Sequence, residues 1–142
     1  MKEREITAHH EAGHVAIAYA LNVPVDCVTI IPHEGRSGGI WHHKTNPEKE
    51  ILITMAGPFA EAQFTSKTAR FLGDDAAGVK DAMAILPGSI EYYEEATKHL
   101  VQKNWIEIEA IANELLISSG VLCGAQLNQI ILCARLDSFD ME

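Results

Sequence analysis

The sequence contains few cysteines and few basic residues, and each shortage excludes a class of protein. Three cysteines in 142 residues are an odd number without metal-type spacing, so we expect buried thiols in a reducing compartment rather than a disulfide framework. Eleven Lys and Arg stand against 20 Asp and Glu, and the formal net charge is −9. Because nucleic-acid binders and proteins that dock on anionic lipid need clustered Lys and Arg, the sequence predicts neither nucleic acid nor membrane as a partner.

Long apolar segments are also absent. The longest, around residues 15–25, is interrupted by Asn22 and Pro24 and is shorter than the roughly 18 residues that a membrane span needs. The N-terminus is highly charged, and no signal-peptide core follows it. We therefore expect one cytoplasmic domain over residues 1–142, a length that can bury a hydrophobic core.

The spacing of the apolar residues predicts a mainly helical fold, with about five to six helices and a small two-stranded β-ribbon. It predicts helices over residues 3–21, from 47 onward, and over 74–86, 89–118 and 125–135. Gly57 and Pro58 should kink the second of these helices or divide it in two. β-Branched residues between Pro24 and Pro32 predict one strand, and residues 40–43 predict a returning strand after a glycine-rich turn.

Residues 10–14 read His-Glu-Ala-Gly-His and lie on the first predicted helix. Two helical residues four positions apart differ by only about 40° in phase, so His10 and His14 can reach one zinc ion at Zn–N distances of about 2.0–2.1 Å. Glu11 projects to the side of the ion, where it can take a proton from a zinc-activated water and hand it to a leaving amine. Gly13 costs roughly 1 kcal/mol in a helix interior, so we expect another backbone to approach closely there.

A hydrolytic zinc site needs a third protein ligand and an open position. The residues alone leave this ligand open among Glu61, Asp74, Asp75, His33, His42 and His43. Each of these side chains, taken singly, is more often solvated than bound to a metal. Helical phase predicts that His9 points away from the ion, and the residue type of Trp41 favours packing over substrate recognition.

Several stretches together resemble the peptidase domain of the FtsH-type ATP-dependent zinc metalloproteases. Glu3–His14 is similar to the motif helix of that family, and Val25–Pro32 is similar to its strand. Gly38–Trp41 resembles the following edge strand, and Ala56–Glu61 resembles a small-residue stretch that ends in a glutamate. With weaker similarity up to the last predicted helix, the resemblance covers most of the chain.

The resemblance implies roles for individual residues. In the family, the third zinc ligand is an aspartate at the start of a helix shortly after that glutamate, which points to Asp75 here, with Asp74 as the alternative. Glu61 would be a carboxylate that supports a ligand histidine. The residues at which an extended polypeptide substrate would pair with the edge strand are Gly39, Ile40 and Trp41.

Together these residues predict a zinc metalloendopeptidase of the HExxH type that hydrolyses unfolded or flexible polypeptide, with Glu11 as general base. The alternative is a catalytically degenerate, peptidase-like interaction or regulatory module, which the imperfect match over residues 72–76 favours. The 142 residues contain neither the GxxxxGK[ST] phosphate loop nor the membrane anchor of the family. We therefore expect a stand-alone domain, for which an ATPase partner in trans and homo-oligomers are both conceivable.

Overall fold

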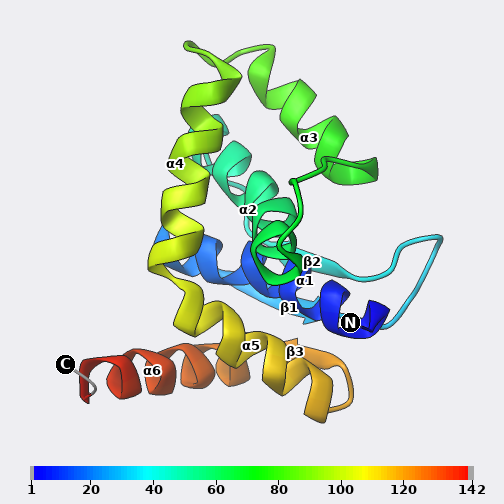
Figure 1. The fold of residues 1–142 in the computed structure, drawn as a ribbon, viewed down its shortest axis with the longest axis vertical. Helices are drawn as coiled ribbons and strands as arrows, with labels where there is room; N and C mark the ends of the chain where they lie inside the picture. Colours follow the sequence, from blue (N-terminus) through cyan, green and yellow to red (C-terminus); the bar gives the residue numbers. More distant parts are fainter. Residues whose placement is uncertain (1, 141–142) are drawn as a thin grey trace.

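The computed structural model describes residues 2–140 and is mainly helical, as predicted. The described part of the chain forms six helices and a small antiparallel sheet (Figure 1). The elements are α1 (Glu3–Ala20), β1 (Val25–Thr29), β2 (Gly39–His42), α2 (Pro47–Thr65), α3 (Gly73–Met83), α4 (Ile90–Lys103), α5 (Trp105–Ile117), β3 (Val121–Cys123) and α6 (Gly124–Asp140).

Helix α1 lies at the centre of the fold and packs against α2 and α5 (Figure 1). Small residues allow this close packing: Ala8 and Ala12 are fully buried. At Gly13 a Cβ atom would lie 2.6 Å from the carbonyl oxygen of Ala56 in α2. The expectation that another backbone approaches Gly13 is therefore confirmed, and it explains why glycine occupies a helix interior there.

Helix α2 begins as the sequence predicts and does not divide at its proline. The Asn46 side chain accepts a hydrogen bond from the backbone N–H of Lys49 at 2.9 Å, and Pro47 occupies the first turn. Pro58 lies inside the helix, which continues to Thr65. The prediction was that Gly57 and Pro58 kink the helix or divide it in two, and division is therefore wrong.

The single helix predicted over residues 89–118 is two helices. Ser89 caps the first, because its hydroxyl oxygen accepts a hydrogen bond from the Tyr92 N–H at 3.3 Å. At Asn104 the backbone leaves the helical conformation (φ −106°, ψ 21°), and the Asn104 side-chain amide donates to the Leu100 carbonyl at 2.9 Å. Such a side-chain bond competes with the helical backbone bonds, so α4 ends here and α5 begins at Trp105.

The predicted two-stranded ribbon is the larger part of a three-stranded sheet with the order β2-β1-β3. β1 pairs antiparallel with β2, and Val28 faces Ile40. The other edge of β1 pairs with β3, which the sequence analysis missed, and Val28 faces Leu122 there. Val28 and Leu122 are buried. The edge of β2 that faces away from β1 has no neighbouring strand among the described residues.

The cysteine prediction is wrong. Cys27 of β1 and Cys123 of β3 stand directly opposite each other, with Cα atoms 4.0 Å apart, and form a disulfide. Cys133 is a free thiol and is exposed rather than buried. The argument from cysteines for a reducing compartment therefore fails, and the cytoplasmic location stays a prediction.

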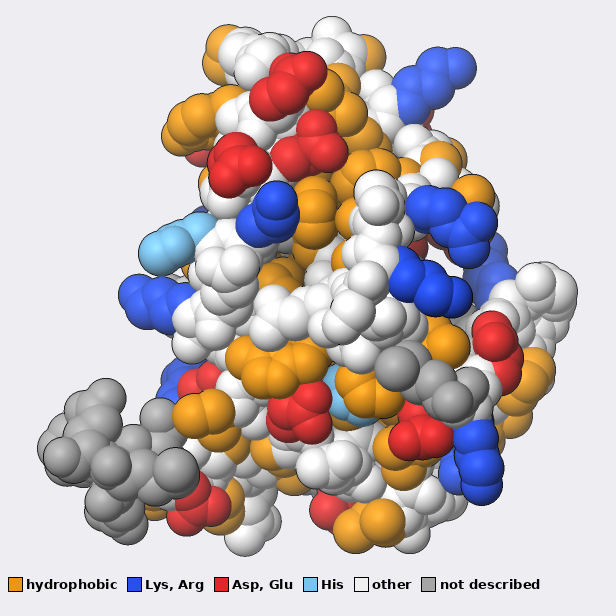
Figure 2. Space-filling view, viewed as in Figure 1, with side chains coloured by type: hydrophobic (Ala, Val, Ile, Leu, Met, Phe, Trp, Pro, Cys, Tyr) orange, Lys and Arg blue, Asp and Glu red, His pale blue; other side chains and the backbone are white. Residues whose placement is uncertain are grey.

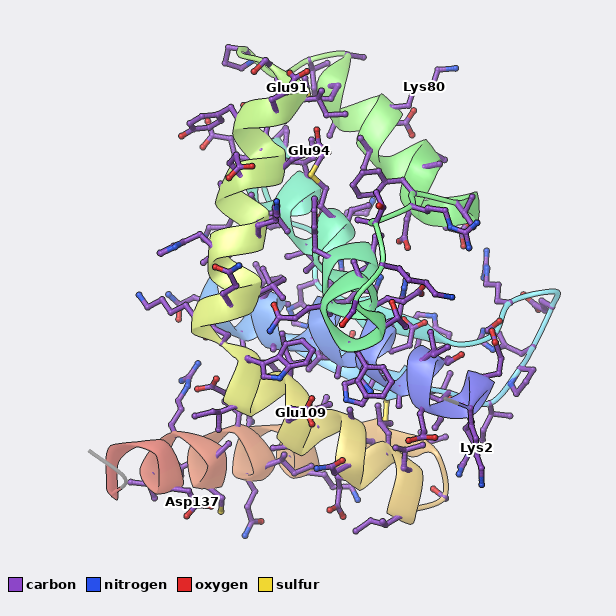
Figure 3. All side chains as sticks on the ribbon, in the orientation of Figure 1. Lys2, Lys80, Glu91, Glu94, Glu109 and Asp137 are labelled. Carbon is purple, nitrogen blue, oxygen red and sulfur yellow. A yellow bond between two sulfur atoms is a disulfide. The ribbon has the colours of Figure 1, made fainter. Side chains whose placement is uncertain are left out.

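On the face shown in Figure 2, charged side chains of both signs lie among apolar ones. Acidic side chains gather at the top of this face, where Figure 3 labels Glu91 and Glu94 on α4. None of the helices within residues 2–140 combines the length and the apolar composition needed to cross a bilayer.

Candidate metal centre

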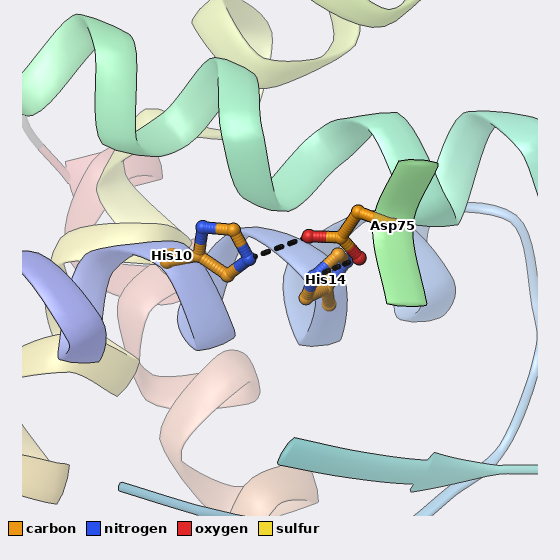
Figure 4. Close-up of side chains that lie close together, drawn as sticks. All are labelled: His10, His14 and Asp75. Atoms are coloured by element: carbon orange, nitrogen blue, oxygen red, sulfur yellow. Dashed lines mark hydrogen bonds and ion pairs between the residues drawn. The ribbon is translucent and has the colours of Figure 1, made fainter. Parts of the chain in front are cut away.

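Three side chains from two helices meet on one side of α1. His10 and His14 come from α1, and Asp75 comes from the first turn of α3 (Figure 4). The Asp75 carboxylate reaches both rings: Oδ2 lies 2.9 Å from His10 Nε2, and Oδ1 lies 3.4 Å from His14 Nε2. Among the described residues, this is the one group of three or more His, Cys, Asp or Glu side chains close enough to share an ion.

The outer ring nitrogens fix which nitrogen of each histidine faces the centre. His10 Nδ1 lies 3.0 Å from Glu61 Oε1, and His14 Nδ1 lies 2.7 Å from the carbonyl oxygen of Ile53. Since both partners are acceptors, each Nδ1 carries the proton and donates. Each Nε2 is then the nitrogen that faces Asp75, and once it loses its proton it can offer its lone pair to a cation, the arrangement that zinc-binding histidines usually have.

Two separations within the donor set are close to those of a zinc site, and its ligand atoms all lie within 4.8 Å of one another. Ligands at about 2.0–2.1 Å from a tetrahedral zinc ion are roughly 3.3 Å from one another. The separations of 2.9 and 3.4 Å between the Asp75 oxygens and the two Nε2 atoms are close to this value. Two imidazoles and one carboxylate leave a fourth position free, which is typical of hydrolytic rather than structural zinc sites.

Gly57 of α2 lies directly against the two rings. A Cβ atom at this position would come within 2.8 Å of His10 Nε2 and would also overlap the ring of His14. The absence of a side chain here makes room for both imidazoles beside α2. From the sequence, Gly57 was expected only to kink or divide the helix together with Pro58, because no local pattern indicates that two rings from another helix pack on it.

Glu11 faces a cleft of about 620 Å³ that also contains the two histidines and Asp75. Its side chain is buried, with 7% of the residue exposed. The connection between β1 and β2 passes over it, so that a Cβ atom on Gly38 would lie 3.0 Å from Glu11 Oε2. Burial raises the pKa of Glu11, although the nearby His14 and His10 oppose this shift.

The histidines and the carboxylates of the centre shift one another's pKa values. Burial disfavours the charged form of His10, but hydrogen bonds to Asp75 and Glu61 outweigh it and raise the pKa of His10 to about 10. The pKa of His14 is raised as well, because its bond to Asp75 overcomes the effect of burial. The pKa of Asp75 is lowered, since the two histidines outweigh its desolvation. Without a metal, the ionised Asp75 carboxylate thus stabilises protons on the two imidazoles. A cation bound at the centre would displace these protons.

The other sequence candidates for the third ligand are outside this group of three side chains. Asp74 is not part of the group that could share an ion, and its Oδ2 forms an ion pair with Arg36 Nε at 2.8 Å. His42 lies 3.7 Å from Glu50, and His43 lies 3.1 Å from Asp26.

His9 also lies apart from the centre, in a buried packing role. Its ring stacks on Phe64 with centroids 3.6 Å apart, and its Nε2 lies 3.2 Å from Glu109 of α5, which Figure 3 labels. The predicted direction of His9, away from the ion, agrees with these contacts.

The predicted edge-strand residues lie along the same cleft. Gly39, Ile40 and Trp41 line it from β2, and His33 lines it from the preceding turn. Trp41 is 49% exposed, which does not fit the packing role that its residue type favoured. His33 stacks on Trp41, a contact that no sequence pattern indicated.

Comparison with known proteins gives partial matches. No family model matches the chain. ATP-dependent zinc metalloprotease FtsH of Magnetococcus marinus is 38% identical over 86 residues, which cover 52% of this chain and 13% of that protein. ATP-dependent zinc metalloprotease FtsH 2 of Alkaliphilus metalliredigens is 40% identical over 72 residues, 42% of this chain and 10% of that protein. The chain thus contains an FtsH-related region that spans a small part of the length of these relatives.

Proposed function

We propose that the chain is a zinc metallopeptidase that hydrolyses peptide bonds in unfolded or flexible polypeptide. The observation that carries this proposal is the convergence of His10 Nε2, His14 Nε2 and the Asp75 carboxylate in a cleft that also holds a buried glutamate. The relationship to proteins named zinc metalloproteases supports the same chemistry.

His10, His14 and Asp75 would hold the ion, and Glu61 would keep His10 in the tautomer that offers Nε2. When bound, zinc polarises a substrate carbonyl and makes water acidic enough to act as a nucleophile near neutral pH. The third ligand is Asp75 rather than Asp74 in this proposal, because among the described residues Asp75 has a carboxylate oxygen close enough to both histidines to share an ion with them and Asp74 is not in that group.

Glu11 would act as the general base. A base works best when its pKa lies near the working pH, and burial moves the pKa of Glu11 in that direction. Glu11 would accept a proton from the attacking water and return it to the leaving amine as the peptide bond breaks. The cleft wall at Gly38 shields the Glu11 carboxylate from bulk water.

The unpaired edge of β2 favours an extended polypeptide as substrate. Backbone N–H and C=O groups on a free edge can pair with an added strand, and this edge borders the cleft. Most strands of a folded protein are already paired or protected at their edges, whereas an unfolded segment or a flexible loop can adopt the extended conformation that this pairing needs. The substrate would therefore be unfolded or a flexible loop. An ATPase in another chain that unfolds proteins would extend the range of substrates to folded proteins.

The purified protein tests the proposal directly. We expect about one zinc ion per chain by elemental analysis, and hydrolysis of unfolded casein that stops with a chelator and returns with added zinc. A chain that binds no zinc, or one that binds zinc and leaves casein intact under all conditions, would reject the peptidase. The second outcome would instead favour the degenerate interaction module.

A further inference from the structure

Trp41 is a half-exposed aromatic side chain beside the cleft, and its ring has one aromatic partner. It lies on the edge strand β2, lines the cleft and is 49% exposed. The His33 ring stacks against it, with centroids 5.7 Å apart and planes at 29°. A large aromatic side chain that is half exposed beside a cleft offers a surface for binding.

The turn that carries His33 holds this ring in place. The backbones of His33 and Arg36 exchange two hydrogen bonds, of 2.9 and 2.8 Å, and His33 Nδ1 donates to the Ile31 carbonyl at 2.9 Å. His33 Nε2 is buried and has no hydrogen-bond partner among the described residues. The contact of His33 with Trp41 is therefore made by the stacked rings, and we expect it to orient the indole.

Glycine at position 39 leaves room beside the indole. Gly39 and Trp41 point to the same face of β2, because side chains alternate along a strand. A Cβ atom on Gly39 would lie 3.6 Å from His33 Cε1 and 3.8 Å from Trp41 Cη2. With no side chain there, a residue of a paired strand can approach the indole from this side.

We propose that Trp41 determines substrate specificity by stacking against an aromatic side chain of the polypeptide, with His33 as a positioning residue. This inference rests on the proposed peptidase function and names the substrate preference of the same site. A residue opposite Trp41 on a strand paired with β2 would have its Cβ about 4.5–5.5 Å away and on the same face, within reach of ring stacking. Leu72, 65% exposed at the start of α3, adds a second apolar surface to the cleft.

The position of Trp41 relative to Glu11 sets where the aromatic residue lies in the substrate. A Cβ atom on Gly38, which precedes β2, would lie 3.0 Å from Glu11 Oε2, and Trp41 follows three residues later. Three residues of extended chain span about 10 Å. The aromatic side chain would therefore lie two to three residues from the cleaved bond, on one side of it.

A peptide library tests the preference. Unstructured peptides would carry Phe, Leu, Lys, Asp or Ala at each position in turn, and mass spectrometry would locate the cleaved bonds. We expect cleavage about three- to ten-fold faster with Phe than with Ala at one position, two or three residues from the bond. Equal rates for Phe and Ala would overturn the inference, as would a preference for Lys, which would indicate a cation–π site.

Variants distinguish the role of Trp41 in substrate binding from general effects on the fold. Trp41→Ala should remove the Phe preference, Trp41→Phe should retain part of it, and His33→Phe should retain most of it because the stacked ring remains. Ile117→Ala, at a residue that is 78% exposed at the end of α5, is the matched control and should change nothing. A Trp41→Ala variant that keeps the full Phe preference would overturn the inference. So would one that only changes the oligomeric state, because Trp41 would then be a self-association contact.

Binding without hydrolysis distinguishes the failure of this inference from failure of the peptidase proposal. In the Glu11→Gln background, Phe-containing peptides should bind three- to ten-fold tighter than their Ala counterparts, and Trp41→Ala should remove the difference. If the wild type hydrolyses nothing but this binding preference holds, the peptidase proposal fails and the aromatic site stands. If hydrolysis proceeds without any Phe preference, the aromatic site fails alone.

Discussion

Glu61 Oε1 lies 3.0 Å from His10 Nδ1, on the side of the ring opposite Asp75. His10 thus lies between two carboxylates that differ in what they can do. Asp75 also reaches His14, whereas Glu61 contacts only His10 within the centre. The bond lowers the pKa of Glu61, so the carboxylate is ionised and stabilises the Nδ1 proton.

Replacing Glu61 should weaken zinc binding without removing a ligand. We expect Glu61→Gln to lower zinc affinity about 10–100-fold, the usual cost of losing a carboxylate behind a ligand histidine. Competition with a chromophoric chelator measures this affinity. Glu109→Gln is the matched control, because Glu109 makes the same kind of contact with the neighbouring His9. Equal losses in both variants would show that the effect is structural.

The two adjacent aspartates should behave differently. Asp75→Ala removes a carboxylate within reach of both Nε2 atoms, so zinc affinity should fall by more than in Glu61→Gln. Asp74→Ala removes only a bond to Arg36 between exposed groups and should leave zinc occupancy unchanged. Elemental analysis of both variants after dialysis measures their zinc content. A larger loss of zinc in Asp74→Ala than in Asp75→Ala would assign the ligand role to Asp74.

Loss of the general base should affect catalysis and not metal binding. Glu11→Gln keeps the shape of the side chain but cannot accept a proton, so kcat should fall about 10²–10⁴-fold. Zinc content should stay at the wild-type level, because Glu11 is not in the donor set. A variant that digests casein at the wild-type rate would disprove the role of Glu11.

A methyl group at position 57 should disturb the centre rather than the helix. Gly57→Ala favours α2 by about 0.5–1 kcal/mol in helix propensity. The new Cβ would nevertheless displace both imidazoles, and we expect zinc affinity to fall at least about tenfold. Gly78→Ala is the control, since its Cβ would meet only the Thr54 side chain, at 3.0 Å. Zinc titration and thermal unfolding of both variants test this, and unchanged zinc affinity in Gly57→Ala would contradict the geometry.

The metal-free protein should be most stable in mildly acidic solution. The pKa of His10 is raised from 6.5 to about 10, so its contribution to stability is complete below pH 6.5 and is lost as the pH rises through about 10. The pKa of Asp75 is lowered from 3.8, so its contribution is complete above pH 3.8 and is lost on acidification. The raised pKa of Glu11 acts in the same sense as that of His10 and moves the optimum toward the acidic end.

Thermal unfolding in chelator at pH 4 to 10 measures this dependence, and Asp75→Asn should flatten it. With zinc in excess the trend between pH 6 and 8 should reverse, because metal binding requires the imidazoles to lose protons. A metal-free protein whose Tm rises from pH 6 to 9 would contradict a stabilising ion pair between His10 and Asp75.

Much of the fold and part of the site follow from local sequence. Apolar spacing identified α1, and the i, i+4 spacing of His10 and His14 put two rings on one face of it, because helical phase depends only on residue number. The helix starts predicted at residues 47 and 89 are local in the same way, since a cap such as Asn46 or Ser89 bonds to a backbone group three residues away.

Features that leave no mark on the apolar spacing were harder to predict. The three-residue strand β3 carries no periodic pattern of its own, so its pairing with β1 and the Cys27–Cys123 disulfide were missed. The break at Asn104 was missed because the apolar spacing continues across it from α4 into α5. A residue that bonds to its own helix, as Asn104 does to Leu100, leaves the hydrophobic pattern unchanged.

The sequence by itself determined that two histidines and a glutamate share one helical turn. Only the tertiary structure decided that Asp75 faces them, that Asp74 does not, and that Gly57 makes room for both rings. The physical reason is that helical periodicity fixes directions within one element, whereas contacts between elements depend on how α2 and α3 pack on α1. That packing arises from burial of side chains along the whole chain, which no short segment encodes.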